Sequence, residues 1–262
     1  MDLHLTNKVF IVTGGAKGIG EAITRELVKE GAIPVIVGRS YSGEAEKLAE
    51  QITSEGGKCL VIVKELGVED ICQSVIEETI TTFGQLDGIV NNAGANDGIG
   101  LEKGNPQAFK KSLLTNLTHY YDLVHYALPH LKKSKGAVVN ISSKTALTGQ
   151  GGTSGYAASK GAQLALTREW ATELLPYGIR VNAVIPAEVM TPLYRKWVNT
   201  FENPEEKLNQ IIAKIPLGNR MTRSEEIAAM TVFLLSDRSA HTTGQWLVVD
   251  GGYVHLDRSI TK

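Results

Sequence analysis

The sequence predicts an α/β protein built on a single doubly wound parallel sheet of seven strands, with helices on both faces. Two observations lead to this fold class. Short apolar runs rich in Val and Ile alternate with longer segments of helical periodicity almost to the end of the chain. In addition, no Pro/Ser-rich linker, repeat or low-complexity tract divides the 262 residues. Because this alternation is typical of parallel strands joined by right-handed crossovers, we expect one domain covering residues 1–262.

The first part of the chain contains three strand–helix units and a fourth strand. A short apolar run precedes a glycine cluster and a helical pattern, and the same succession of strand and helix then occurs twice more. The expected strands are Lys8–Val12, Ile33–Val37, Lys58–Val63 and Leu86–Val90, and the expected helices are Gly18–Glu30, Ser42–Glu55 and Glu69–Phe83.

The second part of the chain continues the alternation with longer helices. The expected helices are Pro106–Leu131, Gly155–Leu175 and Glu225–Leu235, and the expected strands are Ala137–Ser142, Ile179–Ile185 and Trp246–Val249. One irregular region, at about 187–217, contains several prolines that separate short helical pieces. Such an insertion in a compact sheet is typical of a substrate lid, and solvated padding is the alternative.

Composition excludes several classes of function. The net charge of -1 provides no long-range field for nucleic acid or anionic membranes. Apolar residues make up 42% of the chain, enough for a large core, yet no run approaches the roughly 18 residues of a membrane span. The first residues lack the pattern of a signal peptide, so we expect a cytoplasmic protein. Cys59 and Cys72 fall in a predicted strand and helix, where we expect core packing rather than a disulfide.

Three glycines, Gly14, Gly18 and Gly20, fall where the first strand turns into the first helix. Residues without side chains let the backbone approach a pyrophosphate, and the helix N-terminus adds unpaired N–H groups and a positive dipole end. A glycine cluster alone is often only a tight turn. This one follows an apolar strand and opens a helix, so we predict a dinucleotide cradle of the Rossmann type.

The end of the second strand, Gly38-Arg39-Ser40, bears on the choice of cofactor. An acidic residue there would bind both ribose hydroxyls of NAD. Arg39 can instead pair with a 2′-phosphate and stack on adenine, and Lys17 inside the cradle can add a second positive charge. We therefore predict that NADP is preferred. The alternative is that Arg39 is a solvated surface charge and that NADP and NAD both bind.

The turn Asn91–Gly94 ends the fourth strand with small residues. Ligands of open α/β sheets bind beyond the carboxyl ends of the strands, so this turn should form a wall beside the adenosine ribose. Taken by itself, the same run could be an ordinary turn.

Tyr156 and Lys160 are spaced i, i+4, which places both side chains on one helix face. A free tyrosine has a pKa near ~10 and is a poor base at neutral pH. A nearby ammonium, helped by oxidised nicotinamide, should lower that pKa and allow Tyr156 to take an alcohol proton as hydride leaves. Ser143, at the end of the fifth strand, can hold the substrate oxygen.

Asn116 is a poor residue for a helix interior and suits a site where a side chain or water interrupts the backbone ladder and connects Lys160 to solvent. A Tyr-x-x-x-Lys pair also occurs by chance on helix surfaces. Here the upstream cradle and a flexible glycine-rich run between Ser143 and Tyr156 favour an active site. The histidines have no carboxylate or thiol partner at ligand spacing, so we expect no metal site.

These motifs resemble the short-chain dehydrogenase/reductase family over essentially the whole chain. The resemblance includes the Thr-Gly-x-x-x-Gly-x-Gly cradle and the closing Asp250-Gly251-Gly252. It implies a homotetramer, a lysine that also holds the nicotinamide ribose, and a catalytic tetrad of Asn116, Ser143, Tyr156 and Lys160. The cofactor contacts that it and the motifs above imply are Gly14, Ala16, Lys17, Gly18, Ile19, Gly20, Arg39, Ser40, Glu65, Leu66, Asn92, Ala93, Gly94, Tyr156, Lys160, Pro186, Val189 and Thr191.

The chain departs from the family pattern at two positions. The usual Pro-Gly after the sixth strand is Pro186-Ala187 here, followed by Glu188, which should reshape the nicotinamide end of the pocket. The usual Asp that contacts adenine aligns with Glu65, a change that keeps the acceptor.

Within the family, several stretches resemble bacterial L-fucose dehydrogenases and related aldose dehydrogenases, among them Ser142–Thr145, Ile185–Met190 and Ser239–Gly244. The resemblance implies oxidation of the anomeric hydroxyl of a free sugar to a lactone. Polar side chains suit a polyhydroxylated ligand, although each of them could instead face water. The expected substrate contacts are Asn96, Ser143, Lys144, Gln150, Tyr156, Glu188 and Trp197.

Two alternatives remain open at this point. One is a reductase of ketones or 3-oxoacyl substrates on the same scaffold, and the other is a cofactor-binding protein that has lost catalysis. The sequence also leaves open whether the C-terminal tail, Leu256–Lys262, enters the site of a neighbouring subunit.

Overall fold

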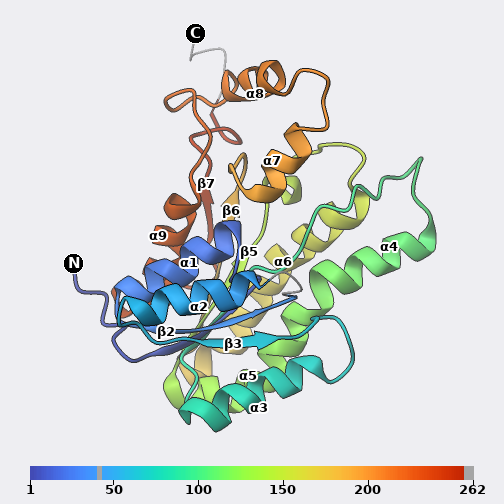
Figure 1. The fold of residues 1–262 in the computed structure, drawn as a ribbon. Helices are drawn as coiled ribbons and strands as arrows, with labels where there is room; N and C mark the ends of the chain where they lie inside the picture. The colour runs from blue at the N-terminus through green and yellow to red at the C-terminus, as the bar shows by residue number, and fades with distance from the viewer. Residues whose placement is uncertain (40–42, 257–262) are drawn as a thin grey trace.

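The computed structural model describes residues 1–39 and 43–256 and contains a seven-stranded sheet in which every pairing is parallel (Figure 1). The strand order is β3-β2-β1-β4-β5-β6-β7. The strands are β1 Val9–Thr13, β2 Ile33–Gly38, β3 Leu60–Val63, β4 Gly88–Asn91, β5 Ala137–Ile141, β6 Arg180–Pro186 and β7 Trp246–Val249. The prediction of a doubly wound parallel sheet is confirmed. Because the chain reverses its direction of winding between β1 and β4, their carboxyl ends flank the crevice where such sheets bind ligands.

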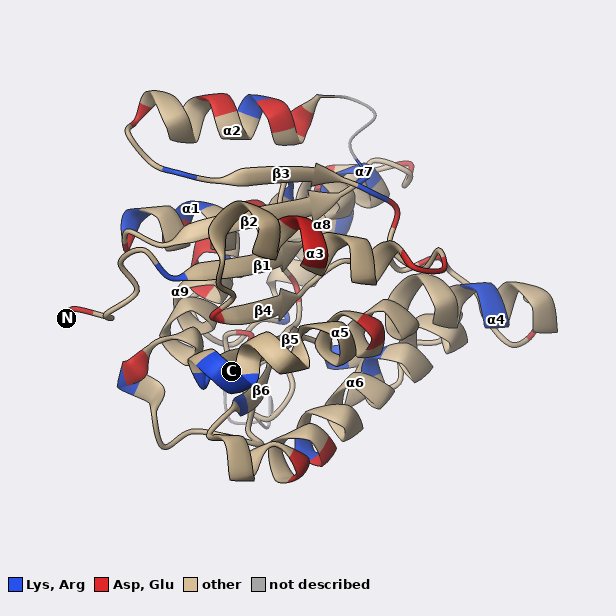
Figure 2. Cartoon of the chain, turned by 90° about the horizontal axis from the view of Figure 1, so that it is seen from below, with Lys and Arg blue, Asp and Glu red and all other residues tan. Residues whose placement is uncertain are grey.

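Helices cover both faces of the sheet, as the view from below shows (Figure 2). The helices are α1 Gly18–Lys29, α2 Glu44–Ser54, α3 Ile71–Phe83, α4 Pro106–Leu113, α5 His119–Ser134, α6 Ser154–Glu173, α7 Pro192–Val198, α8 Pro204–Ile212 and α9 Ser224–Leu235. Residues of α3, α5 and α6 pack in one buried cluster, and residues of α1 and α9 pack in another on the opposite face. A smaller cluster holds α2 against β2.

The first strand illustrates how the sequence builds this core. Val9 and Ile11 belong to the cluster on one face, whereas Phe10 and Val12 belong to the cluster on the other. All four are buried, because a strand at the centre of a parallel sheet has helices over both its faces. This explains why the central strands are continuous apolar runs.

The predicted helix over Pro106–Leu131 is not one continuous α-helix. It consists of α4, a π-helical turn at Leu114–Thr118, and α5, which runs on to Ser134. The correction has a physical cause, because Asn116 lies in the π turn and uses its side chain and its carbonyl for contacts outside the helix. Such a bulge is frequent at functional sites.

The segment after β6 carries the short helices α7 and α8, which lie beyond the sheet at the top of the view in Figure 1. An isolated parallel bridge between Val189 and Thr222 ties the start of this segment to the residues before α9. The predicted lid over about 187–217 therefore contains two helices, and its role in closing a site stays a prediction. Within the described part of the chain, no helix combines the length and apolar character needed to cross a membrane.

Candidate active site

The cradle has the backbone shape that a pyrophosphate site needs. Gly14 and Gly18 have φ values of 63° and 56°, in the left-handed region that favours glycine. A Cβ at Gly14 would lie 3.0 Å from Asn92 Nδ2, and a Cβ at Gly20 would collide with the Gly14 carbonyl oxygen. Because α1 begins at Gly18, its free N–H groups open at the same point. The residues present therefore fit a dinucleotide phosphate.

The turn after β4 is bonded to the cradle. Asn92 donates from Nδ2 to the Thr13 carbonyl oxygen at 2.8 Å, and Thr13 Oγ1 accepts from the backbone N–H groups of Asn92 and Ala93. A Cβ at Gly94 would lie 2.8 Å from Asn116 Oδ1. The structure thus brings the predicted ribose wall beside the glycine turn, and the Asn92 side chain holds that turn in place.

The two cations predicted to read a 2′-phosphate each have a carboxylate partner. Lys17 forms an ion pair with Glu44 at the start of α2, and Arg39 Nη1 lies 3.2 Å from Glu65 Oε1. Both partners of the second pair are about half exposed, so solvent competes for this contact. Glu65, predicted to contact adenine, lies beside Arg39. Ser40 lies outside the described residues.

Most of the remaining predicted cofactor residues pack against the core clusters. Ile19 packs on the core cluster of α1, Leu66 on that of α3, and Ala16 on that of α2. Pro186 is buried at the end of β6, and Val189 is buried in the core cluster of α1 and α9. Thr191 caps α7 by accepting from the Tyr194 N–H, and its Cβ lies 3.3 Å from where a Cβ of Gly18 would be.

Ser143 and Tyr156 lie together at the carboxyl end of β5. Ser143 caps a short 3₁₀ turn at Lys144–Ala146, and its hydroxyl lies close enough to the Tyr156 phenol to lower the pKa of that phenol. Burial has the larger effect and raises the pKa of Tyr156 to about 12. In the polypeptide by itself the direction of this pKa is therefore set by desolvation, and the expected lowering by the Lys160 ammonium together with oxidised nicotinamide stays a prediction.

Lys160 is almost fully buried, and its ammonium is held by three oxygen atoms. Nζ donates to the Ile141 carbonyl at 2.7 Å, to Gln163 Oε1 at 3.2 Å and to Tyr120 Oη at 3.3 Å. It also lies 5.5 Å from the centre of the Tyr156 ring. Burial lowers the pKa of Lys160 to about 7, so a modest change in surroundings shifts its charge near neutrality.

Asn116 reaches Lys160 only through another residue. Its side chain accepts from the Ala95 N–H at 2.8 Å and donates to the Ser112 carbonyl at 3.1 Å. Its backbone carbonyl accepts from Gln163 Nε2 at 2.7 Å. Sequence reasoning missed both Gln163 and Tyr120. The available signal was their spacing, i+3 from Lys160 and i+4 from Asn116, which places each on the inner face of its helix.

Lys144 and Glu188, predicted as separate substrate contacts, form an ion pair with each other. Tyr194 on α7 donates from its hydroxyl to Glu188 Oε2 at 2.6 Å, and Lys144 Nζ lies 4.4 Å from the centre of the Tyr253 ring. The two charged side chains are only 14% and 10% exposed. This cluster joins the residue after Ser143 to the lid.

The other predicted substrate contacts are more exposed. Asn96 and Gln150 lie in exposed, irregular segments, the first after β4 and the second before α6. Trp197 is 43% exposed and packs edge-on between Tyr194 and Phe201 along α7. The role of these three side chains in substrate binding stays a prediction. Among residues 1–39 and 43–256, no group of three or more His, Cys, Asp or Glu could hold a metal ion.

A backbone shaped for a pyrophosphate lies next to a phenol, an ammonium and a hydroxyl at neighbouring strand ends, an arrangement suited to hydride transfer between a nicotinamide and a carbinol carbon. Fold and site together define an NAD(P)-dependent dehydrogenase. The chain belongs to the short-chain dehydrogenase/reductase family, whose model described as Enoyl-(Acyl carrier protein) reductase matches residues 14–254.

Two curated relatives cover nearly the whole chain. The L-fucose dehydrogenase of Mus musculus is 36% identical over 98% of this chain and 92% of its own length. The 3-oxoacyl-[acyl-carrier-protein] reductase FabG of Thermotoga maritima is 34% identical over 96% of this chain and 100% of its own length.

Two solved structures share the fold. The Cj0485 dehydrogenase has a TM-score of 0.94 and 46% identity, covering 99% of this chain and 98% of that one. The ligand-free aldohexose dehydrogenase of Thermoplasma acidophilum has a TM-score of 0.88 and 29% identity, covering 98% of each chain.

Proposed function

We propose that this dehydrogenase oxidises the anomeric hydroxyl of a free aldose, such as L-fucose, to the lactone. The C1–H bond breaks as hydride and the C1 hydroxyl releases a proton, so two electrons and two protons leave the sugar in total. A bound nicotinamide cofactor accepts the hydride and, when oxidised, adds a positive charge near the phenol. Ser143 holds the sugar oxygen, and Tyr156 takes the proton, as the contact between their hydroxyls supports.

The observation that carries the proposal is the cluster of Lys144, Glu188 and Tyr194. After their mutual contacts, the ammonium still has N–H donors and the carboxylate still has lone pairs. A donor and an acceptor side by side match a pair of neighbouring hydroxyls. Burying such groups beside an acyl chain would cost free energy, whereas a polyol satisfies them.

A second candidate function is an NADPH-dependent reductase of ketone or 3-oxoacyl substrates. The relationship to the Thermotoga maritima reductase favours it, while the relationships to the mouse and Thermoplasma acidophilum enzymes favour a sugar. The two functions differ in the polarity required of the pocket wall, and the buried charged cluster next to Ser143 favours the sugar.

A spectrophotometric screen tests this choice. The protein is assayed with a panel of aldoses and NADP or NAD, and in parallel with ketones and 3-oxoacyl thioesters and NADPH. We expect an absorbance rise with one or a few aldoses, lost in Glu188→Leu while cofactor affinity is kept. If NADPH is oxidised in the presence of the thioesters and no aldose gives a response, the reductase is favoured.

For the cofactor, we propose that NADP is preferred, with NAD as the alternative. The support is the pair of cations Arg39, after β2, and Lys17, in the cradle, whose carboxylate partners would have to give way to a 2′-phosphate. Arg39→Asp should therefore weaken NADP binding by about 1.5–3 kcal/mol and NAD binding much less. Glu65→Gln is the matched variant, because it frees Arg39 and should strengthen NADP binding. Equal losses for both cofactors in Arg39→Asp would exclude this role.

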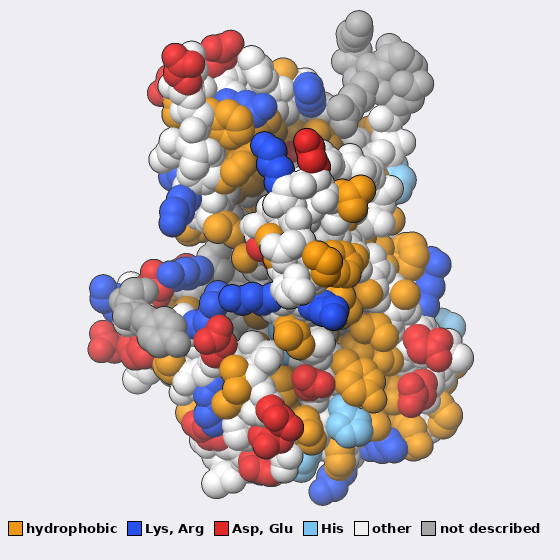
Figure 3. All heavy atoms as spheres, turned by 90° about the vertical axis from the view of Figure 1, so that its right-hand side faces the viewer, with side chains coloured by type: hydrophobic (Ala, Val, Ile, Leu, Met, Phe, Trp, Pro, Cys, Tyr) orange, Lys and Arg blue, Asp and Glu red, His pale blue; other side chains and the backbone are white. Residues whose placement is uncertain are grey.

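We further propose a homotetramer. Hydrophobic side chains gather on one side of the face shown in Figure 3. On α5, Tyr121 is 53% exposed and stacks on His125, and Leu114 in the adjoining π turn is 49% exposed. Light scattering coupled to size exclusion should give four times the chain mass, and Tyr121→Glu should reduce it. A monomer at micromolar concentration would contradict the assembly.

A further inference from the structure

The ammonium of Lys160 is satisfied entirely by neutral groups from three elements. Its acceptors are the Ile141 carbonyl at the end of β5, the Tyr120 hydroxyl on α5 and the Gln163 amide on α6. An ammonium has three N–H donors, so these acceptors account for all of them. Each acceptor replaces part of the hydration that the buried charge has lost.

Gln163 differs from the other two acceptors because its amide extends the contact beyond the lysine. Its Oε1 accepts from Lys160, and its Nε2 donates to the Asn116 carbonyl at 2.7 Å. That carbonyl belongs to the π turn at Leu114–Thr118. Gln163 is fully buried, so no solvent competes for either bond. The helical interruption at Asn116 is thereby connected to Lys160 through one side chain.

We infer that Gln163 is a positioning residue, whose amide ties the Lys160 ammonium to the π turn and favours the charged form of that lysine beside Tyr156. A primary amide between an ammonium and a carbonyl fixes both partners, but it is a poor carrier of protons. Gln163 therefore acts by holding charge in place. Tyr120 assists by accepting a weaker, longer bond from the same ammonium.

The charged and titratable groups that face Lys160 are few within the described residues. Tyr156 faces it from the same helix, and Tyr120 and His119 face it from α5. Burial lowers the pKa of His119 to about 4, so His119 is neutral at physiological pH and does not repel the ammonium. The state of Lys160 therefore depends on its neutral acceptors, of which Gln163 is a side chain that substitution can remove.

Unfolding of the protein without cofactor or substrate gives a direct test. Gln163→Met keeps the length of the side chain and removes both hydrogen bonds. The drop in melting temperature should be larger at about pH 6, where the lysine is charged, than at about pH 9.5, where it is largely neutral. The same substitution made in Lys160→Met should show a drop that does not change with pH. Ser159→Ala is the matched control, because that buried hydroxyl bonds only the Gly155 carbonyl.

Catalysis gives an independent readout. The pH at which kcat/KM for substrate oxidation reaches half its maximum should move upward in Gln163→Met, because a less stable ammonium supports the Tyr156 phenolate less well. Tyr120→Phe should move it in the same direction by less, and Ser159→Ala should not move it. A pH-independent loss of stability in Gln163→Met, or an unshifted profile, would overturn the assignment. The unfolding test needs no sugar, so its failure is distinguishable from failure of the proposed substrate.

Discussion

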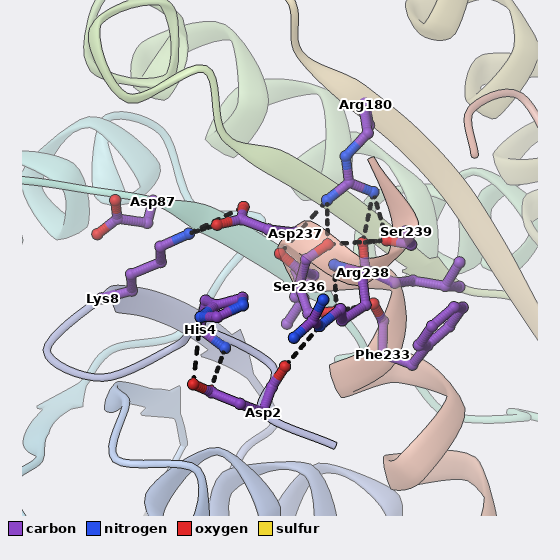
Figure 4. Close-up of polar contacts among 12 residues, drawn as sticks. Asp2, His4, Lys8, Asp87, Arg180, Phe233, Ser236, Asp237, Arg238 and Ser239 are labelled. Carbon is purple, nitrogen blue, oxygen red and sulfur yellow. Dashed lines mark hydrogen bonds and ion pairs between the residues drawn. The ribbon is translucent and has the colours of Figure 1, made fainter. Parts of the chain in front are cut away.

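The two ends of the sheet use charged residues in opposite ways. At the amino ends of the strands, Lys8 precedes β1 and Arg180 begins β6, and both are paired with polar groups of the segment after α9 (Figure 4). At the carboxyl ends, Lys160 is buried among neutral partners and Tyr156 is partly buried beside it, and each has its pKa moved toward the uncharged form. The groups at the carboxyl ends therefore lower the stability of the folded protein where we expect the reaction, whereas the paired charges at the amino ends raise it.

Arg180 is the centre of the amino-end network. Its Nη1 donates to the Leu234 carbonyl at 2.7 Å and to Ser239 Oγ at 2.8 Å, and its Nη2 donates to the Ser236 carbonyl at 3.1 Å. These carbonyls end α9, where unpaired acceptors and the negative end of the helix dipole favour a cation. The network thus supplies hydrogen-bond donors to the carbonyl groups at the end of α9, and we expect it to take no part in the reaction.

The largest expected effect comes from Tyr156→Phe. Removing the phenol oxygen deletes the proposed proton acceptor, so turnover should fall by roughly 10²–10⁴-fold, the range for a general acid–base group. Cofactor affinity, measured by quenching of protein fluorescence, should change little. Turnover equal to that of the unchanged protein would show that the carboxyl end is not catalytic and would support a cofactor-binding protein without activity.

The next effect is expected at the amino end. Arg180→Met keeps the aliphatic stem and removes charged hydrogen bonds to the end of α9, so the free energy of unfolding should fall by about 1.5–3 kcal/mol. Urea denaturation measures this loss. Activity per folded molecule should be unchanged, because Arg180 lies at the far end of the strands. A loss of kcat in Arg180→Met without a loss of stability would contradict the view that the amino ends only stabilise the fold.

A pH series sharpens the comparison further. The pKa of Lys160 is about 7 in the folded protein against 10.5 for an unperturbed lysine, so the unfolded chain binds the extra proton between these values. The free energy of unfolding should therefore rise as pH increases from about 7 toward about 10. Above that window the raised pKa of Tyr156 acts in the opposite direction. Lys160→Met should abolish the rise, and an identical slope in both proteins would contradict the burial of Lys160.

Much of the fold and part of the site follow from local sequence. The strands fall within a residue or two of their predicted bounds, as with Lys8–Val12 against Val9–Thr13, because central strands are continuous apolar runs. The cradle could be predicted equally well, because its glycines lie between a strand and a helix and two of them, Gly14 and Gly18, have positive φ. Local patterns of this kind do not depend on the rest of the chain.

What the sequence could not supply are pairings that depend on topology. Tyr120 and Lys160 are 40 positions apart, and Lys144 and Glu188 are 44 apart, so nothing in either local pattern indicates their contact. The burial that raises the pKa of Tyr156 was missed for the same reason. An adjacent ammonium is visible in the spacing, whereas the degree of burial is set by the elements packed around it.

The smallest expected effect concerns the exposed part of the amino-end network. Lys8 Nζ lies 3.0 Å from Asp237 Oδ1, with the two side chains 30% and 60% exposed. Solvent and salt screen such a pair, so Asp237→Asn should lower the free energy of unfolding by no more than about 0.5 kcal/mol, and added salt should erase the difference. Denaturation at low and high ionic strength, with Arg180→Met as the partly buried reference, measures both. A salt-resistant loss as large as that of Arg180→Met would mean that the whole network acts as one unit.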